Sequence, residues 1–437
     1  TGGGPKYRNI SIMTFSGALD KMDQTSFRAE ENVKLGYYET VFKENNIKTE
    51  ITTGEKVSFY RITYPKNQSK ELKIDPGFFL GEEKIPDARE AQQFVGSQIE
   101  IVSDTEVRGY SRIRGGWNNG RAYTVYFWAV FDQPIAKYVT FKDGKFYNNQ
   151  KAQFDSGKKT GALLSFGNSG KEELNVKIGI SFLSELKAKN NIEIEIPHWN
   201  FNTVLAALEN KWEDLLNRIK LSDDTSLEYK KMFYTGLYHT MIMPVDRTGE
   251  NPLWTNDEPY YDDFYTIWDT FRTSSPLITL IDSKRKVDII NAMLNIYKRE
   301  GYMPEGRSGN DNGRTQGGSN AEVVIADAFV KKLKGIDYEL ALQAMIKDAT
   351  VPPGGNEERE GRGGLLDYLK LGYVPYGTDR AGNRTIDYSY NDYNIAAVAK
   401  GLGKTELYNQ YMKQAESWQN LWRADYENNG AKGFIMP

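Results

Sequence analysis

The sequence predicts a multidomain fold in which an antiparallel β-sandwich precedes an all-α region. Two patterns along the chain predict this division. Up to about residue 196, β-branched and aromatic residues recur in short, partly alternating runs separated by turn clusters. After Trp199, apolar residues recur with the spacing of an amphipathic helix.

The N-terminal part, residues 1–197, is expected to be the sandwich domain. No amphipathic helix of comparable quality interrupts its apolar runs, so we expect mainly antiparallel sheets. Clusters such as Gly115-Gly116 mark the turns. The clearest strands are predicted at 57–65, 122–131, 174–184 and 192–197.

A linker helix is predicted over residues 198–224, followed by a helical domain over 225–437. The linker helix is predicted from an apolar stripe of helical period. This stripe consists of Val204, Leu205, Leu208, Trp212, Leu215, Leu216 and Ile219.

About nine helices are expected after the sandwich. One begins at a capping Asp282 and ends at Gly301. Another begins with Ser319 and Glu322 in capping-box spacing and ends at Gly335. Others are centred on 234–241, 340–346, 365–369, 393–399 and 407–422.

The stretch FYTIWDTFRTSSPLITLI, residues 264–281, carries the clearest candidate site. We expect a helix whose first turn presents Trp268, Asp269 and Arg272 ahead of an apolar run. An indole can cover the C–H face of a sugar ring while a carboxylate and a guanidinium bond its hydroxyls. The alternative is a helix start with a local ion pair and a core tryptophan.

Composition excludes several classes of site. The chain has no cysteine and two histidines, so thiolate catalysis and zinc sites rich in Cys or His are not expected. Acid and base chemistry then falls to carboxylates. The formal net charge of −3 gives no basic field for nucleic acid. No apolar run is long enough to span a membrane, and the start lacks a signal peptide's apolar segment, so it is a mature or an incomplete beginning.

Long glycine-rich loops separate the helices at 304–318, 352–364 and 376–384. Loops of this kind on a helical scaffold usually surround a site. Disorder is the alternative for the second loop, whose charged run from Glu357 to Arg362 is expected to be solvated.

The order of these segments resembles glycoside hydrolase family 92, the calcium-dependent exo-acting α-mannosidases with a β-sandwich and an (α/α)6 barrel. The similarity covers roughly residues 37–424. YHT and WDTFR are its more specific pieces. The matching pieces, in family order, are GGW and YTVYFWAVFDQP, VKIGISFLS, KNNIEIEIPHWNF, FYTGLYHTMIMP, FYTIWDTFRTSSPLITLI, NAEVVIADAFVKK and DYSYNDYNIAAVAKGLG.

Two departures from the family pattern concern the ends of the chain. The lead-in to the sandwich is shorter than in the family, and about nine helices are fewer than the twelve of a closed barrel. The family's general acid, general base and calcium-binding segments follow the point where this chain stops. We therefore expect a piece of a longer polypeptide, or one of two fragments, with catalytic residues and metal ligands unknown.

The resemblance implies an inverting, Ca²⁺-dependent hydrolase of α-1,2 or related mannosidic linkages in N-glycans or mannans. It places Asp269 and Arg272 in the −1 subsite with Trp268 nearby. Arg314 and Asn320 are expected either to contact sugar or to serve as turn and cap residues. It also favours a periplasmic, cell-surface or secreted location in a bacterial envelope. Alternatives are another (α/α)6 glycosidase, a disaccharide phosphorylase, or a non-catalytic carbohydrate-binding protein if the chain ends at residue 437.

Other candidate residues have structural interpretations. His239 is expected to be a satisfied core histidine within an apolar helix. Glu305 and Asp311 could be taken for an acid/base pair, but the family pattern does not place catalysis there. Packing and hydrogen bonding are the expected roles of Tyr388, Tyr390 and Asp392.

Overall fold

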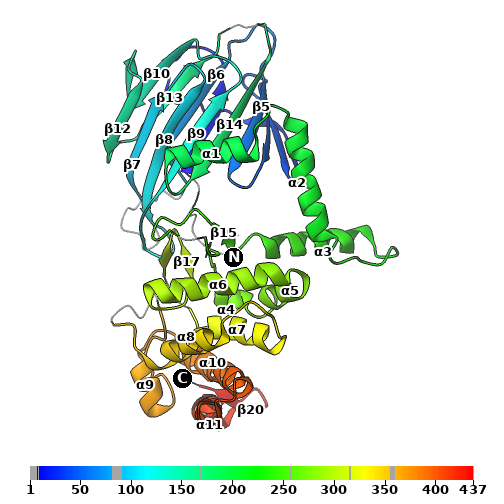
Figure 1. Cartoon of the computed structure of the whole chain (residues 1–437), viewed down its shortest axis with the longest axis vertical. Helices are drawn as coiled ribbons and strands as arrows, with labels where there is room; N and C mark the ends of the chain where they lie inside the picture. Colours follow the sequence, from blue (N-terminus) through cyan, green and yellow to red (C-terminus); the bar gives the residue numbers. More distant parts are fainter. Residues whose placement is uncertain are drawn as a thin grey trace. The chain divides into compact units, whose positions relative to one another are not determined.

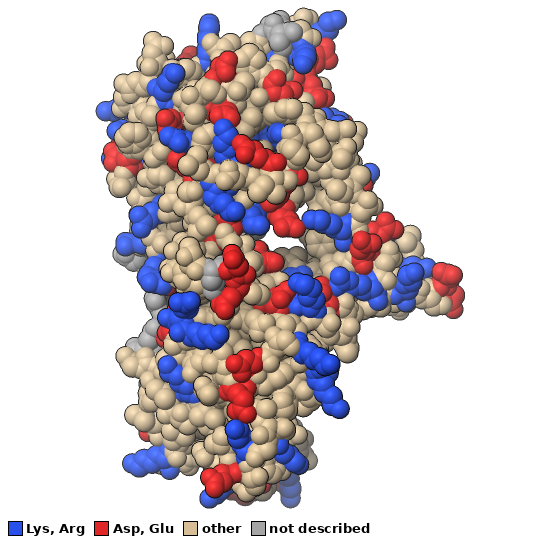
Figure 2. Space-filling model, in the orientation of Figure 1, with Lys and Arg blue, Asp and Glu red and all other residues tan. Residues whose placement is uncertain are grey.

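The computed structural model describes residues 7, 9–80, 91–167, 170–255, 257–313, 316–354 and 360–436 (Figure 1). The chain forms two compact units, with the boundary between Asp223 and Asp224. The first unit is mainly β and the second mainly α. Within the described residues, no helix is both long enough and apolar enough to cross a bilayer. Acidic and basic side chains are intermixed on the face drawn in Figure 2.

Two antiparallel sheets form the first unit. One has five strands in the order β1-β6-β13-β10-β11, and the other has nine in the order β12-β7-β8-β9-β14-β5-β4-β3-β2. The strands of the first are β1 (Asn9–Phe15), β6 (Glu71–Phe79), β13 (Thr160–Ser165), β10 (Lys137–Lys142) and β11 (Lys145–Asn148). Those of the second are β12 (Ala152–Ser156), β7 (Gln92–Ile101), β8 (Glu106–Gly115), β9 (Gly120–Phe131), β14 (Glu173–Ser181), β5 (Val57–Thr63), β4 (Lys48–Thr53), β3 (Tyr37–Phe42) and β2 (Arg28–Lys34).

Apolar side chains from both sheets form one core, which confirms the predicted sandwich. Ile74 and Leu164 come from the five-stranded sheet, and Ile62, Phe127 and Val176 come from the nine-stranded sheet. All five are fully buried. The alternation that predicted β5, β9 and β14 therefore directs every second side chain into the space between two layers.

The strand predicted at 192–197 is wrong, because these residues belong largely to helix α1 (Glu185–Glu195). The Ser184 hydroxyl caps the helix by accepting a hydrogen bond from the Lys187 N–H at 3.1 Å. Ile192 and Ile196 are buried, whereas Ile194 is 74% exposed. Apolar residues four apart fit one helical face as well as they fit an alternating strand, so the pattern alone was ambiguous.

Helix α2 (Phe201–Leu216) forms where the apolar stripe predicts a helix. The Asn200 side chain caps it by accepting from the Thr203 N–H at 3.1 Å. Phe201 and Val204 in its first turn are buried against the sandwich residues Val57 and Phe59.

The second unit contains most of the predicted helices. Asp282 caps α6 by accepting from the Arg285 N–H, and α6 ends at Gly301 with φ +96°, both as predicted. Buried residues of α6, α7, α8 and α10 form its main apolar core. The helices are α3 (Leu227–Met241), α4 (Ile267–Thr270), α5 (Ser274–Ile281), α6 (Ser283–Glu300), α7 (Ala321–Val330), α8 (Tyr338–Thr350), α9 (Leu365–Leu371), α10 (Ala381–Gly401), α11 (Thr405–Gln414) and a 3₁₀ helix (Ser417–Leu421).

The second unit is not all-α as predicted. Its short strand pairs are β15 (Val245–Asp246) with β16 (Tyr261–Asp262), β17 (Arg307–Ser308) with β18 (Asp311–Asn312), and β19 (Trp422–Asn428) with β20 (Ala431–Ile435). Asn429 and Gly430 connect β19 to β20 and both have positive φ. Asn-Gly is the preferred sequence for such a two-residue hairpin turn.

Several helix boundaries also differ from the predictions. The helix expected across 264–281 is interrupted between α4 and α5, since Pro276 would remove a hydrogen bond and clash with the preceding turn if one helix continued through it. Helix α7 ends at Val330, five residues before Gly335. Helix α10 begins at Ala381, inside the loop expected at 376–384.

His239 is not a core histidine. It is exposed on α3, where its ring lies 5.6 Å from that of Tyr238. Leu237 and Met241 supply the buried positions of this helix.

Candidate functional site

Helix α4 presents Trp268 and Asp269, the first two predicted site residues. Thr266 precedes the helix in the left-handed conformation with φ +57°. Ile267 is buried and anchors the helix in the apolar core, while Trp268 is half-buried and Asp269 is exposed. The short helix therefore holds its backbone against the core and leaves the carboxylate of Asp269 accessible.

Arg272 follows α4 and remains close to Asp269 through the backbone. Its N–H donates to the Asp269 carbonyl at 3.3 Å, and its guanidinium lies 4.6 Å from the ring centre of Phe271. Among the described residues, no ion pair joins the side chains of Asp269 and Arg272. Both side chains are exposed, so both are available to a ligand.

The loop before α7 brings Trp268 together with Asp387 of α10. A Cβ atom placed on Gly317 would lie 3.4 Å from Trp268 Cβ, 2.2 Å from Asp387 Oδ2 and 3.5 Å from Asn320 Nδ2. Gly317 thus fills the space between these three side chains, and no larger residue fits there without displacing them. Sequence analysis did not select Asp387, although it opens the segment DYSYND.

Asp387 is 9% exposed, and only one of its two carboxylate oxygens accepts hydrogen bonds from the described residues. Oδ2 accepts from the Gly318 N–H at 2.9 Å and from Asn383 Nδ2 at 3.4 Å. Oδ1 accepts no hydrogen bond from any residue that the structure describes. Burial raises the pKa of Asp387, and the Gly318 N–H and the positive charge of Arg272 lower it in part.

Asn320 is fully buried, and both ends of its side-chain amide are used within the protein. Nδ2 donates to the Gly318 carbonyl at 3.3 Å, and Oδ1 accepts from Asn391 Nδ2 at 3.2 Å. It occupies the cap position of α7 without a side-chain cap hydrogen bond. A direct sugar contact by Asn320 stays a prediction. Arg314 lies outside the described residues.

The predicted capping box of α7 is wrong, because its residues have other partners. Ser319 Oγ accepts from Arg362 Nε at 2.9 Å instead of capping the helix. The carboxylate that reaches the helix N-terminus is Glu305, whose Oε1 accepts from the Ala321 N–H at 2.6 Å. Glu305 is fully buried, and burial raises its pKa well above the usual value.

The charged run that ends at Arg362 was expected to be solvated, but Arg362 is 1% exposed. It donates to Asp392 Oδ1 at 2.7 Å, and its Nη2 lies 3.7 Å from Glu322 Oε1. Tyr368 donates to the other oxygen of Asp392 at 2.8 Å. Residues 357–359 of the run lie outside the described residues.

The three residues expected to pack and to form hydrogen bonds, Tyr388, Tyr390 and Asp392, lie on α10. Tyr388 is buried and donates to the Gly363 carbonyl at 2.8 Å. Tyr390 is 45% exposed, with its ring 6.0 Å from that of Phe271. Asp392 is fully buried in its ion pair.

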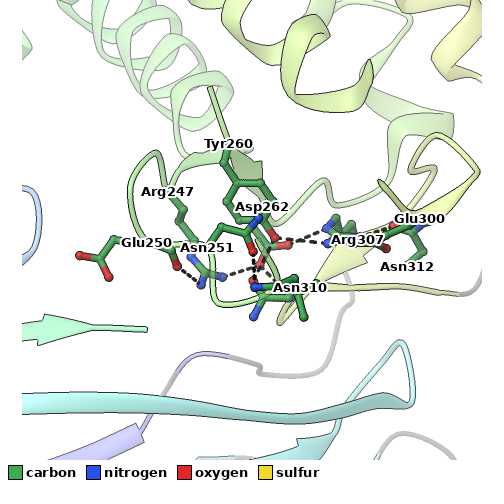
Figure 3. Close-up of polar contacts among 10 residues, drawn as sticks. Arg247, Glu250, Asn251, Tyr260, Asp262, Glu300, Arg307, Asn310 and Asn312 are labelled. Carbon is green, nitrogen blue, oxygen red and sulfur yellow. Dashed lines mark hydrogen bonds and ion pairs between the residues drawn. The ribbon is translucent and has the colours of Figure 1, made fainter. Parts of the chain in front are cut away.

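A buried polar network supports the chain segment that leads into α4 (Figure 3). Arg307 is fully buried and donates to both oxygens of Glu300, at 2.7 and 2.9 Å. Asp262, also fully buried, accepts from Arg247 at 2.8 Å, and Arg307 Nε lies 3.4 Å from its other oxygen. Tyr260 donates to Asn310 Oδ1 at 2.9 Å. Two arginines and two carboxylates thus meet inside the protein, where removal of one partner would leave an uncompensated buried charge.

Backbone hydrogen bonds connect this network to the site. The Arg307 N–H donates to the Phe264 carbonyl at 2.9 Å, and the Ile267 N–H donates to the Glu305 carbonyl at 3.3 Å. The loop expected to surround the site at 304–318 is therefore hydrogen-bonded to α4 and to the segment before it. Residues 304–313 of this loop are buried. Asp311 lies in this buried hairpin.

Two family models match the chain. The glycosyl hydrolase family 92 N-terminal domain matches residues 1–181, and the glycosyl hydrolase family 92 catalytic domain matches residues 187–437. A curated relative, described as an uncharacterized secreted glycosidase of Arthroderma benhamiae, is 30% identical over 480 residues. That alignment covers 100% of this chain and 57% of the relative.

Solved structures of this family are similar to the chain. An inverting mannosidase from Bacteroides thetaiotaomicron has a TM-score of 0.84 and 25% identity, covering 98% of this chain and 59% of its own. An α-mannosidase from the same organism, solved with mannoimidazole, has a TM-score of 0.83 and 26% identity, covering 97% and 57%. The chain thus spans somewhat more than half the length of these relatives. Because the two family models account for nearly all of its residues, the chain belongs to glycoside hydrolase family 92.

Proposed function

We propose that this chain is part of an exo-acting α-mannosidase that hydrolyses its substrate with inversion. Membership of family 92 supports this proposal, as does the similarity to an inverting mannosidase of the same family. We further propose that helices α3 to α11 contribute to an (α/α)6 barrel in the whole protein. The proposed substrates are α-1,2 or related mannosidic linkages of N-glycans or mannans.

The proposal rests on the corner that Trp268 and Asp387 form around Gly317, where the positive charge of Arg272 is close enough to lower the pKa of Asp387. Trp268 supplies an aromatic face for the C–H side of a pyranose ring. Asp387 Oδ1 accepts no hydrogen bond from the described residues, so it can accept one from a hydroxyl. Arg272 supplies several N–H donors for the same ring. Together with the exposed Asp269, the corner has the residue types that bind a polyhydroxylated sugar.

Inversion needs two carboxyl groups in addition to a binding site. One protonates the leaving oxygen, and the other deprotonates the attacking water from the opposite face, at a separation of roughly 6.5–9.5 Å. We assign neither role to a described residue. Glu305, Glu322 and Asp348 are buried inside the helical unit, and the role proposed for the Trp268 corner is to hold and orient the terminal mannose.

We also propose that the whole protein requires Ca²⁺, which bound beside the site would hold vicinal hydroxyls of the sugar. Among the described residues, no group of three or more Asp, Glu or His side chains could hold a metal ion. No residue of this chain is assigned to the ion. A secreted or envelope location is proposed, supported by the description of the Arthroderma benhamiae relative as secreted.

The complete protein should be tested with an aryl α-mannoside and with an α-linked mannobiose. The proposal predicts hydrolysis with β-mannose as the first product by NMR, loss of activity in EDTA, and recovery with calcium. Activity that requires phosphate would indicate a phosphorylase. Sugar binding without turnover would contradict the enzymatic proposal.

A further inference from the structure

Lys286 is buried beside an apolar cavity on another face of α4 from the sugar-binding corner. The cavity has a volume of about 40 Å³. Ile267 and Thr270 of α4 line it, whereas Trp268 and Asp269 do not. The other apolar walls include Phe264, Ile278, Ile289, Met293 and Val324.

The amine of Lys286 has few polar neighbours. The side chain is 1% exposed, and Nζ donates to Ser275 Oγ, its one hydrogen-bond partner among the described residues. Asp327 is the nearby carboxylate, but it accepts from Thr279 at 2.9 Å and pairs with Lys331. Lys286 therefore has no ion pair of its own in the described part of the chain.

The protonation of this amine differs from that of a surface lysine. Burial lowers the pKa of Lys286 to about 7, although the charge of Asp327 raises it and that of Lys331 lowers it further. A lysine with this pKa holds an uncharged amine in a much larger share of molecules at neutral pH than a surface lysine does. An uncharged amine in a desolvated, apolar site is a nucleophile that can attack a carbonyl carbon.

We propose that the Lys286 cavity is a carbonyl-binding site, in which Nζ forms an imine with a short aliphatic aldehyde. A water needs roughly 10–15 Å³ of such volume, so the cavity accommodates a chain of about three or four heavy atoms. The nitrogen lone pair forms the C–N bond, both N–H protons of the neutral amine pass to the carbonyl oxygen, and the C–O bond breaks to release water as C=N forms. The step is a condensation and needs neither an oxidant nor a reductant.

Lys284 offers an internal control two residues away on the same helix. Its side chain is 89% exposed, and it pairs with Asp288 Oδ2 at 2.8 Å. The hydrogen bond and the charge of Asp288 raise its pKa above that of an ordinary lysine, so the Lys284 amine is charged at pH 7. Lys284 is the more accessible residue and Lys286 the more nucleophilic one.

The test treats the full chain with dilute propanal and cyanoborohydride at pH 7, where hydride reduces the C=N bond to a stable propylamine. Peptide mass spectrometry then gives the initial rate at each lysine. We expect Lys286 to be propylated at least about tenfold faster than Lys284. An equal or slower rate at Lys286 would overturn the proposal, and this comparison needs no variant.

A second experiment tests whether the cavity itself provides access. Ile278→Phe adds volume to the cavity wall and leaves both lysines in place. We expect the rate at Lys286 to fall at least about tenfold, the rate at Lys284 to be unchanged and the thermal transition to be retained. An unchanged rate at Lys286 would show that the aldehyde does not enter through this cavity, which contradicts the proposal.

Discussion

Gly318 donates its backbone N–H to Asp387 Oδ2 at 2.9 Å, which fixes the loop before α7 directly against α10. The approach is close because Gly318 has no side chain. A Cβ atom there would lie 2.0 Å from Asn391 Oδ1 and 2.9 Å from Asp387 Cβ. The position of the proposed sugar ligand Asp387 therefore depends on a glycine in a neighbouring loop.

Replacing this glycine should disturb both stability and the site. Gly318→Ala forces the loop away from α10, and overpacking of this kind costs about 1–3 kcal/mol. A matched control is Gly236→Ala, since Gly236 lies within α3 with nothing within 4 Å of an added Cβ. Alanine there should stabilise the protein by about 0.5–1 kcal/mol. Urea denaturation checks both values, and equal stability of the two variants would contradict this account.

Arg362 should be among the most sensitive buried residues of the helical unit. Arg362→Met leaves Asp392 charged and buried without its cation, which costs about 3–5 kcal/mol. The double variant Arg362→Met/Asp392→Leu should recover much of this loss, because it also removes the carboxylate that Arg362 contacts most closely and leaves only Glu322, whose pKa burial raises. At the exposed pair Arg423–Asp425, Arg423→Met should leave the unfolding midpoint unchanged. A double variant no more stable than Arg362→Met would contradict the ion-pair explanation.

The buried carboxyl groups predict how stability depends on pH. Burial raises the pKa of Glu322 to about 7. Its folded-state pKa lies above the unfolded value of about 4.3. Its contribution to the free energy of unfolding is therefore fully present below about pH 4.3, where Glu322 is protonated in both states. The contribution is lost as pH rises from about 4.3 through about 7. Urea denaturation of the helical unit should show this loss, and Glu322→Gln should reduce the slope across the same window.

Glu50 in the sandwich should behave in the opposite way. Burial raises its pKa, but hydrogen bonds from Arg61 and Tyr37 outweigh burial and lower it overall. Its contribution is therefore present above the unfolded pKa and is lost as pH falls. Urea denaturation of Glu50→Gln and Glu322→Gln should show the two contributions changing with pH in opposite directions. If the free energy of unfolding changed with pH in the same direction for both groups, this assignment of causes would be contradicted.

The charge of Arg272 should set the pH at which Asp387 ionises. Its positive charge lowers the pKa that burial raises, so Arg272→Met should raise the pKa of Asp387 further. If ionised Asp387 binds the sugar, the acid limb of kcat/KM for an aryl α-mannoside should move to higher pH. Arg299→Met, an exposed position at the end of α6, serves as the charge-matched control. An acid limb that does not move in Arg272→Met would remove Arg272 from contact with this carboxylate.

The sequence predicted the sandwich and most helices because their apolar residues follow a clear period. Strands β5 and β9 alternate, and α6 carries both a capping Asp282 and a terminal Gly301. Ile192 and Ile196 misled the prediction because their spacing fits both periods. The Asn429-Gly430 pair is itself a hairpin signal, since this dipeptide favours the positive φ angles of a two-residue turn.

The candidate site was only partly predictable, because its residues are far apart in the chain. Trp268 and Arg272 could be selected from one segment, but Asp387 comes from a helix more than a hundred residues later. Only the folded structure shows that Gly317 brings Asp387 and Trp268 together. Arg362 was misassigned to solvent because its partners, Ser319 and Asp392, lie in other elements.

The most direct test of the central claim is kcat/KM of the complete protein carrying Asp269→Asn, measured with an aryl α-mannoside. We expect a loss of at least about a hundredfold, about 2.7 kcal/mol of transition-state stabilisation, with an unchanged circular dichroism spectrum and thermal transition. Wild-type kinetics in this variant would contradict it, because Asp269 would then not contact the sugar.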